Sequence, residues 1–449
     1  MAEAAAPLAA DMPPTAEPIG GASHRYILLM LLGAYTLSFL DRQVISILAE
    51  SIKKDLHLSN LELGMLTGLA FAIFYTFLGI PIARLADRRS RPLIIAASMA
   101  LWSGFTVLSG RATNFAVMGV ARLGVGFGEA GCNPCAHSLI ADITPPEKRA
   151  SALAFYSLGV PIGTMLGLVL GGVIADAFGW RASFFVAGAP GLMLAIVIAL
   201  TIREPRSQLA AAMQARALSA PSLIDTLREL RGKKTFWLIA GAAGLLAFVG
   251  YGHGAFGAPF FLRVHGAQVA ALAKRFGLGP IGFLGIAGAL TTGVGGLAGT
   301  WLGGFLADRA AARDKRAYMS VPAIAALLSL PVVFLIYTVS DPLVALALGI
   351  IPALLNTLWY GPVYATGQSV VQPQSRATAA AILLFMLNMI GLGLGPMSVG
   401  ALNDLLAGPL GFGEAEGVRW ALLISAGVII VSAGLFWRAR DTVREDIVS

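Results

Sequence analysis

Twelve long apolar runs divide the chain, and they constrain its fold more than any other feature. Each run approaches the roughly 20 apolar residues that a helix needs to cross a membrane. Only 12% of the residues are charged, whereas a soluble domain carries about 25%. We therefore predict an all-α membrane protein with twelve transmembrane helices. The expected spans are residues 26–49, 61–83, 92–110, 114–138, 150–175, 182–202, 235–262, 279–306, 317–339, 342–366, 376–402 and 418–438.

The polar segments between these runs indicate how the chain is divided. Residues 1–24 are rich in alanine and proline and lack the basic and apolar regions of a signal peptide, so we expect a disordered cytoplasmic tail. The longest polar connection follows the sixth run. We predict a six-helix bundle at 25–202, a cytoplasmic linker at 203–234, a second six-helix bundle at 235–440 and a cytoplasmic tail at 441–449.

Basic residues are distributed unevenly between the two sides of the predicted bundle. Of the 32 lysines and arginines, 22 fall on the side of the N-terminus and 8 on the other side. Short loops rich in lysine and arginine stay in the cytoplasm, so we expect both termini to be cytoplasmic. Because the basic residues lie in short loops between apolar runs, nucleic-acid binding is not expected.

Two motifs occur twice in the chain, in the same order. Leu85–Arg88 (LADR) recurs as Leu306–Arg309, at an offset of 221 residues. Pro146–Ala152 recurs in related form as Pro373–Ala379, at an offset of 227 residues. Two motifs repeated in order at nearly the same offset indicate that the two six-helix halves are a duplication.

Four ionisable residues lie inside two of the predicted spans. Asp41 and Arg42 are in the first, and Arg122 and Glu129 are in the fourth, seven residues apart and hence on one helix face. Charges inside a membrane are costly and usually mark a substrate or proton pathway. We predict that Asp41, Arg122 and Glu129 form a proton-coupling unit, with Arg122 shared between two acids or between an acid and a substrate. A static ion pair between the two spans is the alternative.

Substrate contacts are expected from other polar side chains at mid-span. Arg42 points about 100° away from Asp41 and could bind a phosphate or carboxylate through its planar guanidinium. No metal site is expected. The full set of predicted substrate-binding residues is Arg42, Arg122, Asn133, His253, Asn356, Tyr360 and Asn388.

The loop after the second span resembles the signature loop of the major facilitator superfamily, G-x-L-A-D-R-x-G-R-K. The first copy reads Ala83–Pro92 and departs from the pattern at Ala83, Ser90 and Pro92; the second copy includes Gly304–Arg309. The resemblance implies the major facilitator fold, two six-helix bundles that rock about a central site. It also implies a conformational gate made by Asp87, Arg88, Asp308 and Arg309.

Within that superfamily, Phe39–Arg42 together with Arg122–Ala130 resembles the spinster-like branch. The resemblance implies proton-linked transport of sphingoid or lysophospholipid molecules, and a bacterial member would lie in the inner membrane. Sugar-acid and organic-anion symporters also carry an Asp-Arg pair in the first span, so a small organic anion is the alternative substrate.

Glycines recur every four residues on two spans, which lets helices approach closely. The resemblance implies that these two spans pack across the interface between the halves. The glycines are Gly159, Gly163, Gly167 and Gly171 on the fifth span and Gly295, Gly299 and Gly303 on the eighth.

Two other classes of membrane protein are less consistent with the chain. A membrane enzyme is not expected, because the sequence contains neither H-E-x-x-H nor G-x-S-x-G. A channel is not expected, because gating motifs repeat at the inner loops. The chain also lacks G-x-x-x-x-G-K, so we expect a proton gradient to supply the energy, with no cofactor. Membrane lipids and the substrate are the expected partners, and a monomer should suffice.

Overall fold

The computed structural model describes residues 24–86, 89–145, 148–204 and 223–448. Within these residues the structure is helical, and twelve helices are long and apolar enough to cross a membrane. The predicted fold class is therefore confirmed. Residues 1–23 of the expected tail, 205–222 of the expected linker, and the predicted gate residues Asp87 and Arg88 lie outside the described residues.

The N-terminal half contains the first six spans, several of them built from more than one helical segment. Its segments are α1 (His24–Ile47), α2 (Ala49–Leu56), α3 (Asn60–Gly64), the π-helix η2 (Met65–Leu69), α4 (Ala70–Ala86), α5 (Arg91–Ser109), α6 (Phe115–Glu129), α7 (Cys132–Ile143), α8 (Arg149–Ser157), α9 (Gly159–Phe178) and α10 (Trp180–Thr201).

The C-terminal half begins with a short amphipathic helix of the linker and then contains the last six spans. Its segments are α12 (Leu223–Arg231), α13 (Lys234–Val264), α14 (Gly266–Arg275), α15 (Pro280–Ala311), α16 (Ala317–Thr338), α17 (Pro342–Leu348), α18 (Ile350–Leu355), α19 (Tyr360–Ser369), the 3-10 helix η5 (Pro373–Ser375), α20 (Arg376–Met386), the π-helix η6 (Leu387–Leu394), α21 (Gly395–Ala407), α22 (Gly413–Ala426) and α23 (Val428–Asp446).

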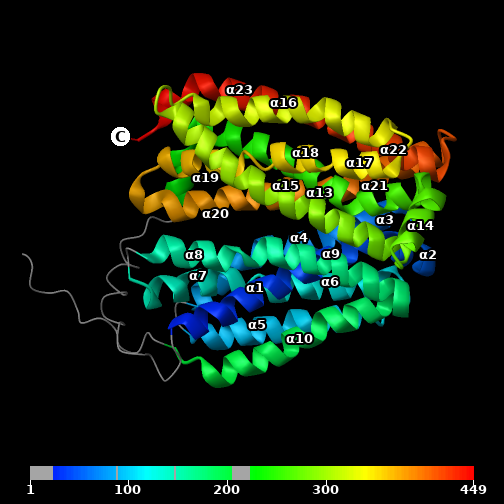
Figure 1. Ribbon diagram of the computed structural model, residues 1–449. Helices are drawn as coiled ribbons and strands as arrows, with labels where there is room; N and C mark the ends of the chain where they lie inside the picture. Colours follow the sequence, from blue (N-terminus) through cyan, green and yellow to red (C-terminus); the bar gives the residue numbers. More distant parts are fainter. Residues whose placement is uncertain (1–23, 87–88, 146–147, 205–222, 449) are drawn as a thin grey trace, which may run out of the picture.

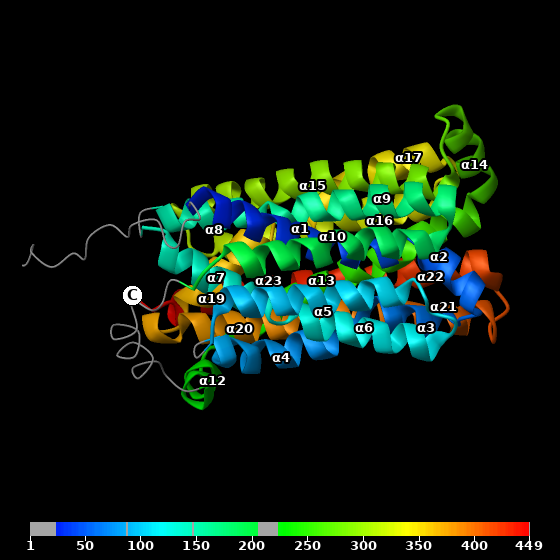
Figure 2. The same cartoon turned by 90° about the horizontal axis from the view of Figure 1, so that it is seen from below.

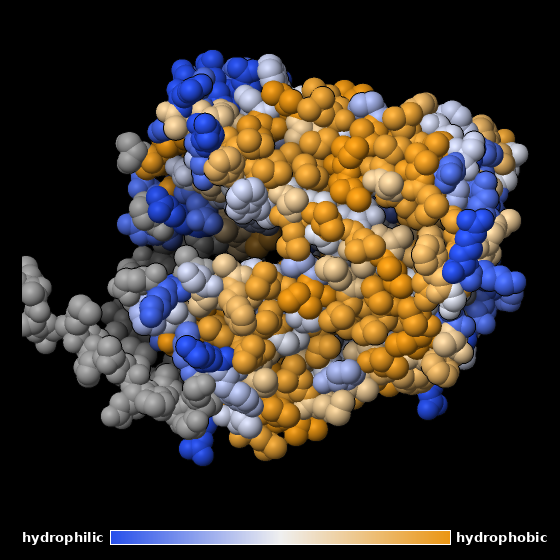
Figure 3. All heavy atoms as spheres, in the orientation of Figure 1, coloured by the Kyte–Doolittle hydropathy of each residue, from blue (hydrophilic) through white to orange (hydrophobic). Residues whose placement is uncertain are grey.

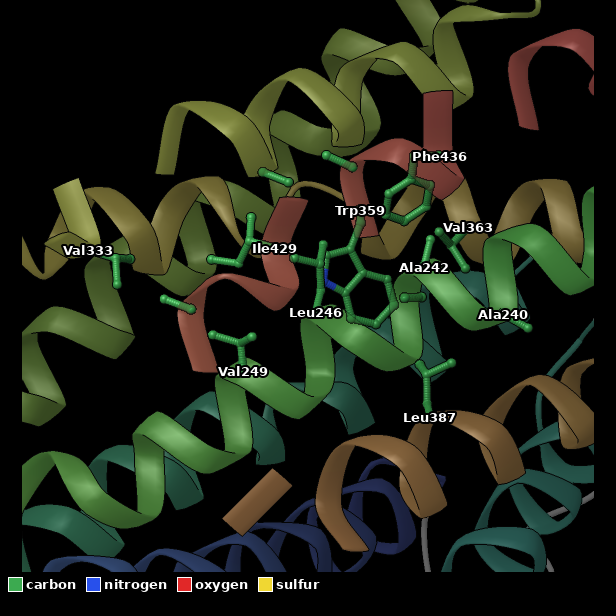
Figure 4. Close-up of a cluster of buried hydrophobic side chains, with 14 of the residues drawn as sticks. Ala240, Ala242, Leu246, Val249, Val333, Trp359, Val363, Leu387, Ile429 and Phe436 are labelled. Carbon is green, nitrogen blue, oxygen red and sulfur yellow. The ribbon is translucent and has the colours of Figure 1, made fainter. Parts of the chain in front are cut away.

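The two halves lie side by side with their helices roughly parallel (Figure 1). Each half has its own packed interior. In the C-terminal half, one buried cluster contains Leu246 of α13, Trp359 directly before α19 and Phe436 of α23 (Figure 4). The face seen in Figure 3 is apolar over a broad central band and polar at both ends. This distribution suits a protein whose flanks face lipid and whose ends face water.

Predicted boundaries differ from the structure in several places, and two of these differences affect the description of the fold. The fourth span is two helices, because α6 ends at Glu129 and α7 begins at Cys132. The last helix does not end at 440 but continues through the expected tail to Asp446. Asp446 caps the start of α13, since Thr235 N donates to its Oδ2 at 2.8 Å, and this contact holds the final turns in place.

The fifth and eighth spans pack against each other across the halves, as expected, but the repeated glycines face other neighbours. Added Cβ atoms at Gly163 and Gly167 would meet α1, which belongs to the same half. An added Cβ at Gly299 would meet Leu354 of α18, again within one half. The interface between α9 and α15 instead uses Gly172 and Gly285, which lie on other faces of the two helices.

The polar contacts that join the two halves gather at the end far from the termini. Arg263 of α13 binds Glu50 of α2 at 2.7 Å, and Lys53 of α2 binds Glu414 of α22 at 3.0 Å. The start of α1 and the C-terminus lie at the opposite end (Figures 1 and 2). Toward that opposite end, the surface is hollowed between the halves (Figure 3). The bundle is therefore closed at one end and parted at the other.

Candidate substrate and coupling site

Helix α1 carries three polar side chains near its middle, Ser38, Asp41 and Arg42. Ser38 lies three and four residues before the other two, so it neighbours both on the helix surface. Asp41 and Arg42 are adjacent and point about 100° apart. Each of these two charges consequently meets a different partner on α6.

The first ion pair joins Asp41 to Arg122. Arg122 Nη1 lies 3.2 Å from Asp41 Oδ2, and Thr106 of α5 donates from Oγ1 to Asp41 Oδ1 at 2.9 Å. Asp41 and Arg122 are each 1% exposed. Removing either charge would leave the other one buried without compensation. The pair is therefore suited to fasten α1 and α6 together.

The second ion pair joins Arg42 to Glu129. Arg42 donates from Nη2 and Nε to Glu129 Oε2 at 2.6 and 2.8 Å, and Ser38 Oγ donates to the same oxygen at 2.6 Å. Glu129 Oε1 is buried and has no hydrogen-bond partner among the described residues. One carboxylate oxygen thus accepts three hydrogen bonds, while the other accepts none among the described residues.

Aromatic rings surround the Arg42 guanidinium. Its central carbon lies 4.9 Å from the ring centre of Phe39, 4.6 Å from that of Phe71 and 4.4 Å from that of Tyr75. Cations over aromatic faces are stabilised by the ring quadrupole. The Arg42 side chain is 12% exposed, against 1% for Glu129. Of the two ion pairs, this one is therefore the more accessible.

Asn133 of α7 links the rings around this pair. It donates from Nδ2 to Tyr75 OH at 3.2 Å and accepts from Tyr156 OH at 2.5 Å. Tyr35 of α1 stacks on Tyr156 with ring centres 4.5 Å apart. Asn133 therefore orients the aromatic wall beside Arg42, and its own side-chain oxygen and nitrogen are both engaged.

The C-terminal half presents tyrosines toward this wall. Tyr251 of α13 lies near Arg42 and Tyr75 of the N-terminal half. Tyr360 of α19 lies near Tyr251 and near Tyr35 of the N-terminal half. Tyr251 and Tyr360 are 37% and 38% exposed. Partly exposed tyrosines of the C-terminal half therefore lie opposite the aromatic wall of the N-terminal half, and they offer hydroxyl groups together with flat apolar faces.

The remaining predicted substrate residues all belong to the C-terminal half. Asn356 ends α18, and its buried Oδ1 has no partner among the described residues. Asn388 lies half-buried in η6. The structure does not bring His253 to the charged pairs, because its two ring nitrogens bind Ser425 at 3.1 Å and Tyr337 at 3.0 Å.

At the end that carries the termini, Asp308 and Arg309 occupy the last turns of α15. Tyr318 OH donates to Asp308 Oδ1 at 3.0 Å.

The N-terminal half holds a buried cluster at the same end, and sequence reasoning did not predict it. Arg91 binds Asp142 of α7 and Glu204, which follows α10, each at 2.6 Å. The three residues are far apart in sequence, so no local spacing signals the cluster.

The pairing of the four mid-span charges also differs from the expectation in one respect. Of the two roles expected for Arg122, sharing between two acids is not found, because the structure pairs Glu129 with Arg42. The predicted contact between Asp41 and Arg122 is present. Ser38, Thr106 and the rings around Arg42 were not predicted, because hydroxyl and aromatic residues are common in apolar spans.

Comparison with known proteins places these observations in a family. A family model described as Major Facilitator Superfamily matches residues 31–396. An MFS-type efflux pump of Mycolicibacterium smegmatis is 32% identical over 417 residues, which are 92% of each chain. A crystal structure of a bacterial homolog of the human lysosomal transporter Spinster, inward-facing and unoccupied, is 30% identical, with a TM-score of 0.83 over 95% of this chain and 98% of that one.

Two further relatives are named after a transported molecule. The sphingosine-1-phosphate transporter SPNS2 of Danio rerio is 25% identical over 415 residues, 90% of this chain and 81% of the relative. A probable L-galactonate transporter of Escherichia coli is 31% identical over 169 residues, which are 38% of this chain and 37% of the relative.

Proposed function

Because the chain belongs to the Major Facilitator Superfamily and lies among its spinster-like members, we propose that it is a proton-coupled secondary transporter of an amphipathic lipid with an anionic head group. Substrates of such transporters cross by alternating access to a central site. The observation that carries the proposal is the Arg42–Glu129 pair, which is partly open and keeps one carboxylate oxygen unengaged.

Arg42 is the proposed anchor for the head group. Glu129 engages Nε and Nη2 of Arg42, and a phosphate or carboxylate oxygen would bind at the remaining guanidinium nitrogen, Nη1. The apolar chain of the substrate would lie along aromatic side chains nearer the opening. Phe77 of α4 and Phe385 of α20 meet there across the halves, with ring centres 5.4 Å apart.

Competition for Arg42 would couple substrate to protons. An anion that takes the guanidinium deprives Glu129 of its cationic partner, and a buried carboxylate without a cation favours its protonated form. Substrate binding and proton uptake at Glu129 would then occur together. The Asp41–Arg122 pair would keep its geometry during this exchange, with Asp41 as a second proton-coupling residue through its repulsion of Glu129.

We further infer an inward-facing state in a bacterial inner membrane. The distribution of lysine and arginine supports cytoplasmic termini, and the hollow opens toward that end (Figure 3). The spinster homolog with the same fold was also solved inward-facing. A proton gradient would supply the energy without a cofactor, and one chain holds both halves, so a monomer would suffice.

A small organic anion, taken up with protons, is the second candidate. It is favoured by the similarity to the probable L-galactonate transporter. The same guanidinium would bind a sugar-acid carboxylate, and the tyrosine hydroxyls would bind its other oxygens. The two candidates differ in whether the apolar wall near Phe77 and Phe385 contacts the substrate.

Transport in proteoliposomes tests the proposal. A labelled lysophospholipid and labelled L-galactonate are offered in parallel, with and without an imposed pH gradient. Glu129→Gln removes the proton site, and Glu416→Gln is the control, because Glu416 pairs with Arg419 within α22. We expect gradient-driven movement of the lysolipid in the wild type and the control, and loss of the gradient effect in Glu129→Gln.

Movement of galactonate without movement of the lysolipid would favour the second candidate, a small organic anion, as the substrate. Transport of the lysolipid that ignores the pH gradient in the wild type would contradict proton coupling. Equal behaviour of Glu129→Gln and Glu416→Gln would remove Glu129 from the coupling site while leaving the substrate assignment unaffected.

A further inference from the structure

Two carboxylates at the closed end reach from one half to the other and cap helices there. The first is Asp404 of α21. Its Oδ1 accepts from Asn60 N at 2.9 Å, and its Oδ2 accepts from Leu61 N at 2.7 Å. These are the first two amides of α3, where the second span begins. The next amide, Glu62 N, is bound by the local cap Ser59.

The second carboxylate is Asp176 of α9, and its targets are the first free amides of α15. Oδ2 accepts from Gly282 N at 2.6 Å and Oδ1 from Ile281 N at 3.3 Å. Helix α15 starts at Gly279 and Pro280, which provide neither a capping side chain nor an amide at the first position. A side chain at Gly279 would collide with the Asp176 carboxylate, so glycine leaves room for the cap from the other half.

The internal repeat relates the two caps. The capped amides Asn60 and Leu61 correspond to Ile281 and Gly282 at an offset of 221 residues, the same as that of the LADR motif. The two carboxylates are 228 residues apart, close to the offset of 227 for the second repeated motif. Each half therefore donates one carboxylate and receives one.

Caps of this kind stabilise the arrangement in which the two halves are in contact at this end. The first amides of a helix lack partners within the helix and carry partial positive charge, so a carboxylate placed there is favoured. When the capping residue belongs to the other half, separation of the halves breaks the bonds and uncovers the amides. A cap within one half would survive the same separation.

We propose that Asp176 and Asp404 are paired latches that favour closure at the end far from the termini. The proposal rests on alternating access as proposed above, and it concerns the equilibrium between the states rather than the substrate or the proton. Its test can therefore use the protein without substrate, reconstituted in lipid nanodiscs at one pH.

Hydrogen–deuterium exchange is the measurement, because amide exchange reports rare opening. The variants are Asp176→Ala, Asp404→Ala and the double substitution. Asp341→Ala is the matched control: Asp341 caps α17 through Leu343 N at 2.8 Å, but within the C-terminal half. The Asp→Asn variants keep one acceptor oxygen and should give intermediate effects.

We expect each single substitution to accelerate exchange about tenfold, as for loss of a helix cap, at both capped helix starts. Acceleration at the distant start distinguishes a latch from a local cap. In the double variant, the two changes in the free energy of opening should add, because the two sites share no residue. Asp341→Ala should change only the start of α17.

Acceleration confined to the helix whose own cap was removed would overturn the proposal, and so would unchanged exchange in the double variant. Failure of lysolipid or proton transport in the wild type would contradict the proposed function alone, because this exchange experiment contains neither.

Discussion

At the scale of single residues, the two ion pairs of the N-terminal half have different surroundings. Asp41 and Arg122 are closed off from the cavity, whereas Arg42 lies among aromatic rings and retains some exposure. A fully buried ion pair cannot readily exchange one of its partners for a substrate group. A partly exposed ion pair can. Substitutions in the first pair should therefore mainly lower stability, and substitutions in the second should mainly alter function.

Arg42→Lys tests whether the guanidinium is needed as well as the charge. Lysine keeps the charge but has no planar fork and stacks less well on rings. We expect affinity for an anionic lysolipid to fall about tenfold, with little change for a neutral analogue of the same chain length. Arg42→Ala should lower the affinity for the anionic lysolipid further. Isothermal titration with both ligands is the measurement, and equal losses for the two ligands would argue against head-group binding.

Thr106→Val tests the closed pair. It removes the hydroxyl that donates to Asp41 while preserving shape, and loss of a buried hydrogen bond to a charged group costs about 1.5–3 kcal/mol. Thr338→Val is the control, because Thr338 is exposed and binds only carbonyls of its own helix. Unfolding can be followed by reaction of the buried Cys132 and Cys135 with a fluorescent thiol reagent. A lower midpoint of unfolding in Thr338→Val but not in Thr106→Val would contradict a stabilising role for the Thr106 hydroxyl.

The sequence was sufficient to identify the charged residues but not all of their partners. Residue counts along the spans give depth, and depth correctly predicted the contact between Asp41 and Arg122. Counts do not give the rotation of one helix against another. Glu129 could therefore not be assigned to Arg42 rather than Arg122, although both lie in the expected spans.

At the scale of elements, one close approach between the halves involves irregular helices. The π-helices η2 and η6 lie in the second and eleventh spans, and an added Cβ at Gly68 of η2 would meet the η6 backbone. Gly64 similarly faces the backbone at Pro396 of α21. π-helical turns often mark functional positions, and here they accompany the contact that separation of the halves would break.

Gly64→Val should disfavour this contact. The new side chain would overlap Pro396 and Met397, and overpacking costs about 1–3 kcal/mol. We expect faster amide exchange at the start of α3 and a shift toward opening at the far end. Gly79→Val is the control in the neighbouring helix α4, since nothing lies within 4 Å of its Cβ position. Equal exchange in the two variants would contradict a role for this contact in closure.

The glycine repeats show where element-level prediction was insufficient. Four-residue spacing correctly indicated close helix packing, but it could not identify the neighbour. Gly163 packs on α1 and Gly299 on α18, each within one half. A close-packed face has the same spacing whether its neighbour stays fixed or moves, so only the three-dimensional arrangement separates the two cases.

At the scale of the whole molecule, the fold was predictable because the membrane allows few solutions. Run length predicted twelve spans, and the repeated loops predicted two halves. The relative placement of the two halves was not predictable, because the apolar runs and repeated loops do not depend on it. The described contacts at the far end, including Arg263–Glu50 and Lys53–Glu414, identify the arrangement present here.

Cross-linking the closed end tests whether transport requires that end to open. Lys53→Cys with Glu414→Cys replaces an ion pair of 3.0 Å between the halves, and a short bifunctional maleimide would join them. We expect transport to stop, while substrate binding from the side of the termini persists. Asp55→Cys with Arg181→Cys is the control, because that ion pair of 2.6 Å lies within the N-terminal half. Its cross-link should leave transport intact, because the halves can still part. Full transport after complete Lys53–Glu414 cross-linking would contradict alternating access at this end.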